Sequence, residues 1–255
     1  MSAALQLDDV AIRFGGVQAV DGVSFAIEQG DFVGLIGPNG AGKTTLIKII
    51  AGILRPDRGR VRLSGIDVTA YATAARVRRG LALTHQIVRP FREMTVLDNV
   101  VLGAGYRRTS NPFGAMLSTD RRHEIERAAH ILAQVGLAGT ENKPAGSLPL
   151  GQMKRLEVAR ALAVDPQVIL LDEPLAGLNH AEAARQVETI AEVQGRGITV
   201  VLVEHNLEEV MRICRRLIVL NNGKVIGDGK PREVMADPVV HDAYVGGGMV
   251  AHAEG

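Results

Sequence analysis

Nine consecutive residues, Gly37 to Thr45, combine the residue types that bind a phosphate chain. Glycines are spaced through the segment, which ends in Lys43, Thr44 and Thr45. Glycine lets successive backbone N–H groups turn inward around phosphate oxygens. A lysine at this position reaches the terminal phosphates, and the hydroxyl of the next threonine can ligate magnesium. The segment therefore predicts a phosphate-binding loop, against the simpler alternative of a glycine-rich turn before a core helix.

The residues on both sides of this loop fit the same prediction. The apolar run Phe32–Ile36 precedes it as a short strand, and Leu46–Ala51 has the pattern of a helix. Strand, loop and helix in this order give the G-x-x-x-x-G-K-T pattern its meaning, and the helix N-terminus adds a dipole that favours negative charge. The predicted phosphate contacts are Gly37, Pro38, Asn39, Gly40, Ala41, Gly42, Lys43, Thr44 and Thr45.

Two acidic residues, Asp172 and Glu173, follow a second apolar run at 168–171 and precede Pro174. In open α/β sheets, ligands bind beyond the carboxyl ends of the strands. An aspartate there can hold magnesium directly or through water, and the adjacent glutamate can orient or deprotonate an attacking water. The alternative is a pair of carboxylates in a solvated turn.

Three further residues have both a structural and a chemical interpretation. His205 ends the apolar run 199–203, where a histidine can contact a γ-phosphate; by itself it is better explained as a structural histidine, and the other motifs reverse that preference. Gln86 could reach magnesium with its side-chain carbonyl, although without context an ordinary loop glutamine is favoured. Phe14 ends a predicted strand and could stack on a base, or it could be a core phenylalanine.

Length and composition limit the kinds of protein that fit. The 255 residues suffice for one large α/β domain, or for one domain with a small insertion. A net charge of +1 gives no support to a surface for nucleic acid or acidic membranes. No apolar stretch approaches the length of a bilayer span, and the first residues lack the pattern of a signal peptide. With Cys214 as its only cysteine, the sequence predicts a buried thiol and a cytosolic protein that reaches any membrane by docking.

The elements that position these residues alternate along the chain. Strand-like runs at 5–14 and 22–28, separated by a glycine-containing segment, predict a small antiparallel sheet. Further strands are predicted at 60–63, 81–84, 168–171, 198–203 and 217–220, with helices at 71–79, 180–194 and 206–214. This alternation implies a parallel sheet covered on both faces. Helical patterns at 96–102 and 120–135, without strands between about 93 and 165, indicate a helical insertion.

Taken together, the motifs resemble the ATP-binding subunits of ABC transporters from about residue 5 to 245. The resemblance is carried by segment 37–45, Gln86, LPLGQ at 148–152, VILLDEP at 168–174, AGLN at 176–179 and His205, in that order. Within that family, segments 91–104, 151–163, 172–179 and 239–246 are similar to the branched-chain amino acid uptake group. The resemblance implies an α/β fold: a P-loop NTPase core with a mostly parallel sheet, a small antiparallel β subdomain and a helical insertion. One domain would span 1–245, with a helical subdomain at about 90–165 and a flexible tail at 246–255.

The resemblance also implies ATP and Mg²⁺ as the bound groups. Phe14 would stack on adenine and Lys43 would bind the β- and γ-phosphates. Thr44 and Gln86 would ligate magnesium, with support from Asp172.

For hydrolysis, the resemblance implies that Glu173 is the catalytic base and His205 the contact to the γ-phosphate. The signature segment would close over a nucleotide held by a second ATP-binding subunit, so that hydrolysis requires a homodimer or a heterodimer. The residues assigned to that contact are Leu148, Pro149, Gly151 and Gln152, with Asn179 grouped among the nucleotide-binding residues. Gln86 and the helical block would face transmembrane permease subunits at the cytoplasmic face of the membrane.

Pro149 departs from the family pattern, which has a serine whose hydroxyl bonds the γ-phosphate. Proline offers neither a hydroxyl nor a backbone N–H, and Ser147 lies two positions out of register. Loss of a comparable transition-state donor costs on the order of 10²–10³ in rate. The sequence therefore predicts a weakened site on the partner's ATP, although the Gly151 N–H remains available.

Two hypotheses remain open, and a third is disfavoured. The leading one is an ATPase that drives an importer of branched-chain or related amino acids, served indirectly by a solute-binding protein. The second is a regulatory nucleotide-binding partner with little hydrolysis of its own because of Pro149. A soluble ATPase acting on DNA or ribosomes is disfavoured, because the chain has one cassette, no sustained heptads and no basic patch, so no nucleic-acid partner is expected.

Overall fold

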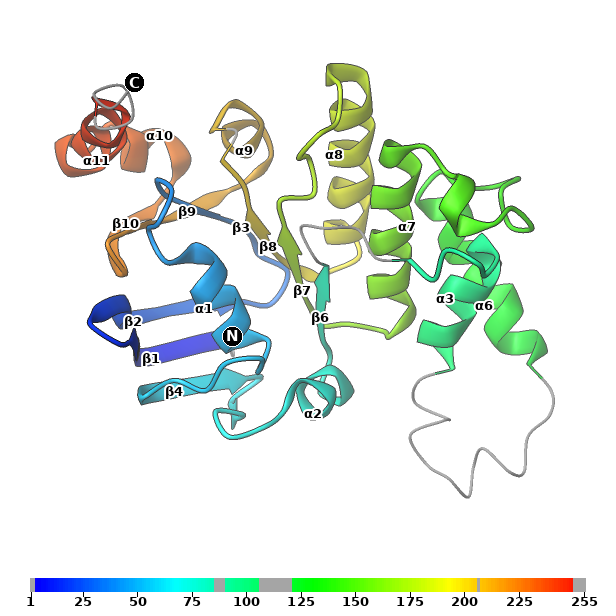
Figure 1. The fold of residues 1–255 in the computed structure, drawn as a ribbon, viewed down its shortest axis with the longest axis horizontal. Helices are drawn as coiled ribbons and strands as arrows, with labels where there is room; N and C mark the ends of the chain where they lie inside the picture. The colour runs from blue at the N-terminus through cyan, green and yellow to red at the C-terminus, as the bar shows by residue number, and fades with distance from the viewer. Residues whose placement is uncertain (1–2, 85–89, 106–120, 206, 250–255) are drawn as a thin grey trace.

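The computed structural model describes residues 3–84, 90–105, 121–205 and 207–249. In this part of the chain the strands form two sheets, with the strand orders β2-β1-β4-β5 and β10-β9-β3-β8-β7-β6 (Figure 1). Helix α1 (Lys43–Ile50) lies between the two sheets, because its buried side chains belong to a cluster that draws on both of them. The expected α/β fold with a mostly parallel sheet and a small antiparallel sheet is confirmed.

The small sheet is antiparallel and is built from β1 (Ala3–Phe14), β2 (Val17–Glu28), β4 (Arg58–Leu63) and β5 (Ile66–Asp67). The expected connection over residues 15–22 is wrong in extent, since Phe14 pairs with Val17 and Ile12 pairs with Val20. Only Gly15 and Gly16 form the turn. Short hairpin loops match the twist of the two strands. The pairing therefore continues beyond Gly22, where the second strand was expected to begin, as far as the turn at Gly15 and Gly16.

The large sheet contains β3 (Phe32–Ile36), β6 (Leu81–Thr84), β7 (Val168–Asp172), β8 (Thr199–Val203), β9 (Arg216–Asn221) and β10 (Lys224–Gly229). All neighbours are parallel except β9 and β10. Every residue of β3 and of β8 is buried, as expected for strands covered on both faces. The carboxyl ends of β3, β7 and β8 therefore meet along one edge of the sheet.

The described part of the helical block packs onto that sheet. It consists of α3 (Val96–Ala104), α6 (Arg122–Gln134), the 3₁₀ turn η1 (Ala145–Ser147) and α7 (Leu150–Ala163). Helices α3, α6 and α7 lie together on the side of the molecule away from the antiparallel sheet (Figure 1). One hydrophobic cluster joins Val100, Leu132 and Leu156 of this block to Ile169 and Leu202 of the sheet, so the block and the sheet share a core.

The remaining helices are α2 (Thr73–Arg78), α8 (His180–Gln194), α9 (Leu207–Ile213), α10 (Pro231–Met235) and α11 (Pro238–Met249). None of the helices in the described ranges combines the length and the hydropathy that crossing a bilayer requires. Cys214 is buried, as predicted, and burial raises the pKa of its thiol to about 12, which leaves it protonated and unreactive near neutral pH.

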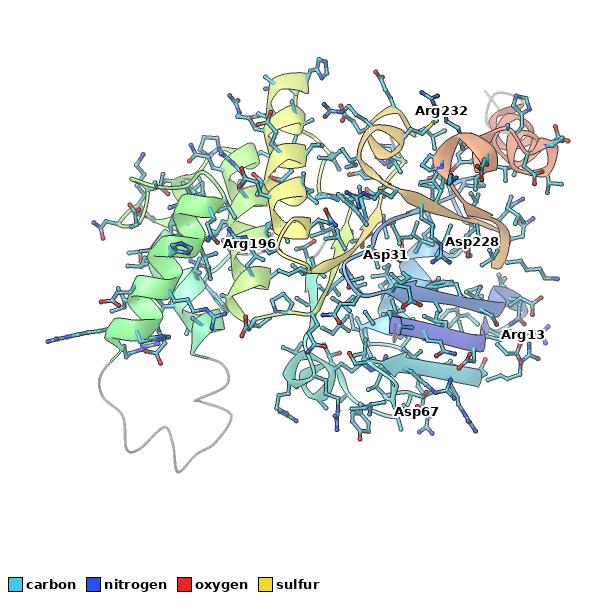
Figure 2. All side chains as sticks on the ribbon, turned by 180° about the vertical axis from the view of Figure 1, so that it is seen from behind. Arg13, Asp31, Asp67, Arg196, Asp228 and Arg232 are labelled. Carbon is cyan, nitrogen blue, oxygen red and sulfur yellow. The ribbon has the colours of Figure 1, made fainter. Side chains whose placement is uncertain are left out.

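The C-terminal segment differs from the expected loose tail. Helix α11 continues through Gly246, Gly247 and Gly248 to Met249, where the expected tail starts at Gly246. Val240 and the partly buried Tyr244 pack against the core and anchor the part of α11 that precedes the glycines. The helix continues from there although glycine has a low helix propensity. Strand β10, which the sequence did not indicate, pairs antiparallel with β9. Asp228 of β10, labelled in Figure 2, also accepts two hydrogen bonds from Arg216 of β9 at 2.6 and 2.7 Å.

Candidate functional site

The segment predicted to bind phosphate forms a loop between β3 and α1, and only glycine fits at two of its positions. Gly37 has a φ of 149°, and a Cβ there would lie 2.1 Å from the Leu220 carbonyl oxygen. Gly42 has a φ of 102°, and its Cβ would lie 2.4 Å from the Ala19 carbonyl oxygen. Gly42 is also the N-cap of α1, which has no side-chain cap. The N-terminal turn of α1 is therefore available to an anion.

Lys43 extends into this loop. Its Nζ donates hydrogen bonds to the carbonyl oxygens of Gly37 at 2.6 Å and Pro38 at 3.0 Å. Burial lowers the pKa of Lys43, while the carboxylates of Glu173 and Asp172 act in the opposite direction. The fold thus brings Lys43 close enough to Asp172 and Glu173 for both carboxylates to stabilise its positive charge.

The other end of α1 is fixed by a buried residue that sequence reasoning missed. Arg76 of α2 is 1% exposed and donates to the carbonyl oxygens of Ile49 and Ile50 at 2.7 and 2.8 Å. It also donates to the carbonyl oxygens of Thr69 and Tyr71, and burial lowers its pKa to about 10. Because Arg76 satisfies carbonyls that a helix end leaves open, it holds α1 in the orientation that aims its N-terminus at the loop.

Asp172 and Glu173 lie at the carboxyl end of β7. Asp172 is the last residue of the strand and is paired with Val203. Glu173 has a φ of 48°, a conformation that residues other than glycine rarely adopt, and its N–H donates to the Val203 carbonyl oxygen at 2.9 Å. Its carbonyl oxygen accepts a hydrogen bond from Lys154 Nζ at 2.9 Å. Strained backbone of this kind gathers at functional sites.

His205 follows β8, as predicted, and its side chain is 62% exposed. The residue before it was missed. Glu204 has a side chain that is 1% exposed, and its Oε1 accepts a hydrogen bond from the Leu175 N–H at 2.8 Å. Burial raises the pKa of Glu204, against the opposing effects of the Leu175 N–H and of His205. A charged residue between an apolar strand and a candidate histidine was the signal that could have identified it.

The signature segment stands at the start of α7. Pro149 is the N-cap of α7 without a side-chain cap, while Leu148 is buried. A hollow of about 120 Å³ adjoins the segment and is lined by Pro149, Gly151, Gln152, Arg155, Glu182 and Arg185. Asn179 is the N-cap of α8 and forms a capping box with Glu182. Its side chain therefore has a structural task that is independent of any nucleotide.

Of the two remaining candidate residues, Phe14 is described by the structure and Gln86 is not. Phe14 is 47% exposed at the end of β1, beside Val17 at 69%, which rules out the alternative of a core phenylalanine. Gln86 lies outside the described residues, which resume at residue 90 after β6 ends at Thr84.

The Thr44 hydroxyl and the Asp172 carboxylate, which are expected to hold magnesium, are the oxygen ligands that this ion prefers. Thr44 is exposed in the first turn of α1, and the Asp172 carboxylate reaches Lys43 electrostatically. Magnesium is held in proteins by one or two such ligands together with substrate phosphates and water. The described residues hold no cluster of three or more histidine, cysteine or acidic side chains that could bind a metal ion.

Comparison with known proteins gives one consistent family. The model of the family described as ABC transporter matches residues 20–176. The chain is 36% identical over 248 residues to the high-affinity branched-chain amino acid transport ATP-binding protein BraF of Pseudomonas aeruginosa, covering 95% of this chain and 97% of BraF. It is also 36% identical over 249 residues to the lipopolysaccharide export system ATP-binding protein LptB of Acidithiobacillus ferridurans, covering 96% and 98%.

Solved structures agree. The ADP conformation of MJ1267, an ATP-binding cassette of an ABC transporter, superposes with a TM-score of 0.84 at 34% identity and covers 96% of this chain and 99% of MJ1267. The dimeric post-hydrolysis structure of the cassette MJ0796 with ADP and Pi gives 0.76 at 27% identity, covering 89% and 99%.

Proposed function

We propose that this chain, which belongs to the ABC transporter family, is the ATP-hydrolysing subunit of an importer of branched-chain or related amino acids. The observation that carries the ATPase part is the convergence of Lys43, Asp172 and Glu173 at the loop between β3 and α1. The cargo is supported by the similarity to BraF over nearly the whole of both chains. The equal identity to the export ATPase LptB makes the cargo and the direction of transport the parts that most need a test.

In this proposal the exposed Phe14 stacks on adenine, and Lys43 moves from its own loop carbonyls to the β- and γ-phosphates. Mg²⁺ bound by Thr44 and Gln86, with Asp172 in support, would neutralise developing charge on the phosphate oxygens. Glu173 accepts a proton from water while the water oxygen bonds the γ-phosphorus.

The bond from the γ-phosphorus to the bridging oxygen breaks in the same reaction. ADP leaves with the electron pair of that bond, and inorganic phosphate is the second product. We assign the γ-phosphate contact to the exposed side chain of His205, which lies two residues after the end of β8.

A second cassette would complete the site. The exposed Pro149 and the hollow beside Gly151 and Gln152 would form the surface of this chain that contacts the nucleotide bound by the partner subunit. Support comes from the dimer of MJ0796, whose fold matches the one described here. Whether the partner is a second copy or a sibling ATPase is decided by the activity that the chain shows alone.

A docking site for the permease subunits is proposed between β6 and the helical block. A hollow of about 520 Å³ there includes Phe91, which is 52% exposed, and Leu102, which is 43% exposed. Arg160 stacks over the Phe91 ring with its guanidinium 5.2 Å from the centroid. An apolar floor with a charged rim fits the end of a membrane-protein helix, which would place the chain peripherally at the cytoplasmic face of the membrane.

Reconstitution tests the cargo. Proteoliposomes in which this chain, a second ATP-binding subunit and branched-chain amino acid permease subunits are assembled are expected to take up labelled leucine, isoleucine or valine when the solute-binding protein is supplied and ATP is on the side of the cassettes. The Glu173→Gln form serves as the control and should abolish uptake. ATP-driven movement of a lipid or of another solute, without amino acid uptake, would contradict the importer proposal.

Replacing Pro149 with serine is expected to raise hydrolysis by the chain alone by roughly tenfold or more, because a hydrogen bond to a charged group contributes about 1.5–3 kcal/mol. Serine is also a favourable N-cap residue for α7. Phosphate release at saturating Mg-ATP measures the effect, with the exposed Pro144→Ser as the matched control. An unchanged rate would show that Pro149 does not limit hydrolysis and would remove the basis for the alternative of a regulatory, nearly inactive partner.

A further inference from the structure

The backbone of Glu173 adopts a conformation that the residue itself does not favour. Its φ is 48°, in the left-handed region where a side chain crowds the following carbonyl. Such a conformation persists only where the surroundings hold it from several sides. The bond from the Glu173 N–H to Val203 provides one constraint, and the Ala176 N–H, 3.2 Å from the Glu173 carbonyl oxygen, provides a second.

A third constraint comes from Lys154, a residue of α7. It is only 5% exposed, and its Nζ donates to the Glu173 carbonyl oxygen at 2.9 Å. Lysine is almost never buried without paired partners. Among the carboxylates that attract this ammonium, Glu204 has the largest effect, ahead of Glu157, Glu173 and Asp172.

The fourth constraint comes from Glu204, at the end of β8. Its Oε1 accepts from the Leu175 N–H at 2.8 Å, and its Oε2 accepts from the His205 N–H at 3.3 Å. Since Pro174 has no N–H, the Leu175 N–H is the first main-chain donor after Glu173 itself. Glu204 therefore holds the chain on the far side of the turn that begins at Glu173.

We infer that Lys154 and Glu204 are positioning residues for Glu173, because together they fix the Glu173 carbonyl and the Leu175 N–H and so hold the strained turn between them. Neither residue touches the reacting atoms. The inference rests on the proposed role of Glu173 as the base.

The same arrangement connects two parts of the molecule. Lys154 lies one turn of helix after Leu150, the first residue of α7, and Pro149 caps that helix. Movement of the signature segment along α7 would be transmitted through Lys154 to the backbone of Glu173. Nucleotide bound by the partner at the signature segment would then act on the base that serves this chain's own nucleotide.

Substitution of Lys154 by methionine tests the first contact, because methionine fills a similar volume and cannot donate. Mg-ATP hydrolysis is expected to fall about tenfold in kcat, while the affinity for a fluorescent ATP analogue stays within about twofold. Lys154→Arg retains a donor and is expected to recover most of the rate. Lys230→Met, at a side chain that is 79% exposed, is the matched control.

Substitution of Glu204 by glutamine tests the second contact more mildly, since the amide oxygen still accepts from the Leu175 N–H while the charge is lost. A smaller fall in kcat is expected. The exposed Glu208→Gln is its control.

Hydrogen exchange supplies a readout that does not depend on activity. Peptides covering residues 172–176 are expected to exchange about tenfold faster in Lys154→Met, whereas exchange in α1 stays at the parental rate. Parental exchange and parental kcat in both variants would overturn the inference. Faster exchange in a protein that never hydrolyses ATP, even before substitution, would support the positioning and reject the proposed function instead.

Discussion

Glu173→Gln is expected to lower Mg-ATP hydrolysis by on the order of 10²–10⁴, the usual contribution of a general base. Glutamine keeps the size of the side chain, and the backbone contacts of residue 173 with Val203 and Lys154 do not involve the carboxylate. The substitution should therefore remove proton acceptance and the negative charge near Lys43 and Lys154, while the backbone contacts remain. Phosphate release, measured in an assembly in which the parent is active, gives the rate, and a fluorescent ATP analogue gives the affinity.

Binding of ATP by Glu173→Gln should remain close to that of the parent. Affinity is expected to stay level or to rise slightly, since a negative charge near the phosphates is removed. The exposed Glu208→Gln controls for loss of a carboxylate elsewhere. Hydrolysis by Glu173→Gln at the parental rate would show that another group accepts the proton.

Lys43→Ala is expected to weaken ATP binding by roughly tenfold to a hundredfold, because a charge-assisted hydrogen bond contributes about 1.5–3 kcal/mol. The substitution also removes the two hydrogen bonds that Lys43 makes to the loop carbonyls. Titration with a fluorescent ATP analogue measures the affinity with and without magnesium.

Lys48 provides the matched control for that experiment. It lies on the same helix and is exposed, so Lys48→Ala should leave ATP affinity within about twofold. A Lys43→Ala protein that binds ATP and magnesium as tightly as the parent would contradict the assignment of the phosphate loop and every role derived from it.

Local patterns were sufficient where a residue's environment is set by its neighbours in the chain. The apolar run before Gly37 predicted β3, and the alternation of apolar runs with helical patterns predicted the parallel sheet. Helix α8 was predicted over the range that the structure shows, 180–194, because its apolar positions recur at the helical period. The assignment of roles to Phe14, Gln86, His205 and the signature segment remains a prediction.

Local patterns failed where distant contacts decide. Helix α11 continues through three glycines, and β10 pairs with β9 at the sheet edge with an added contact between Arg216 and Asp228, which no local pattern specifies. The turn between β1 and β2 consists of Gly15 and Gly16 and is shorter than predicted, because strand pairing across the hairpin outweighs the turn preference of Gly22.

By itself, the sequence determined that this protein has a phosphate loop, an acidic pair after a buried strand and the motif order of an ABC transporter cassette, because those features depend on residue type and short spacing. Only the tertiary structure decided that Lys154 and Glu204 hold the turn at Glu173 and that Arg76 holds the far end of α1. Each of these contacts joins segments that are distant along the chain. Their polar groups are buried together only after the sheet and helices have packed, and burial is what makes each such hydrogen bond costly to lose.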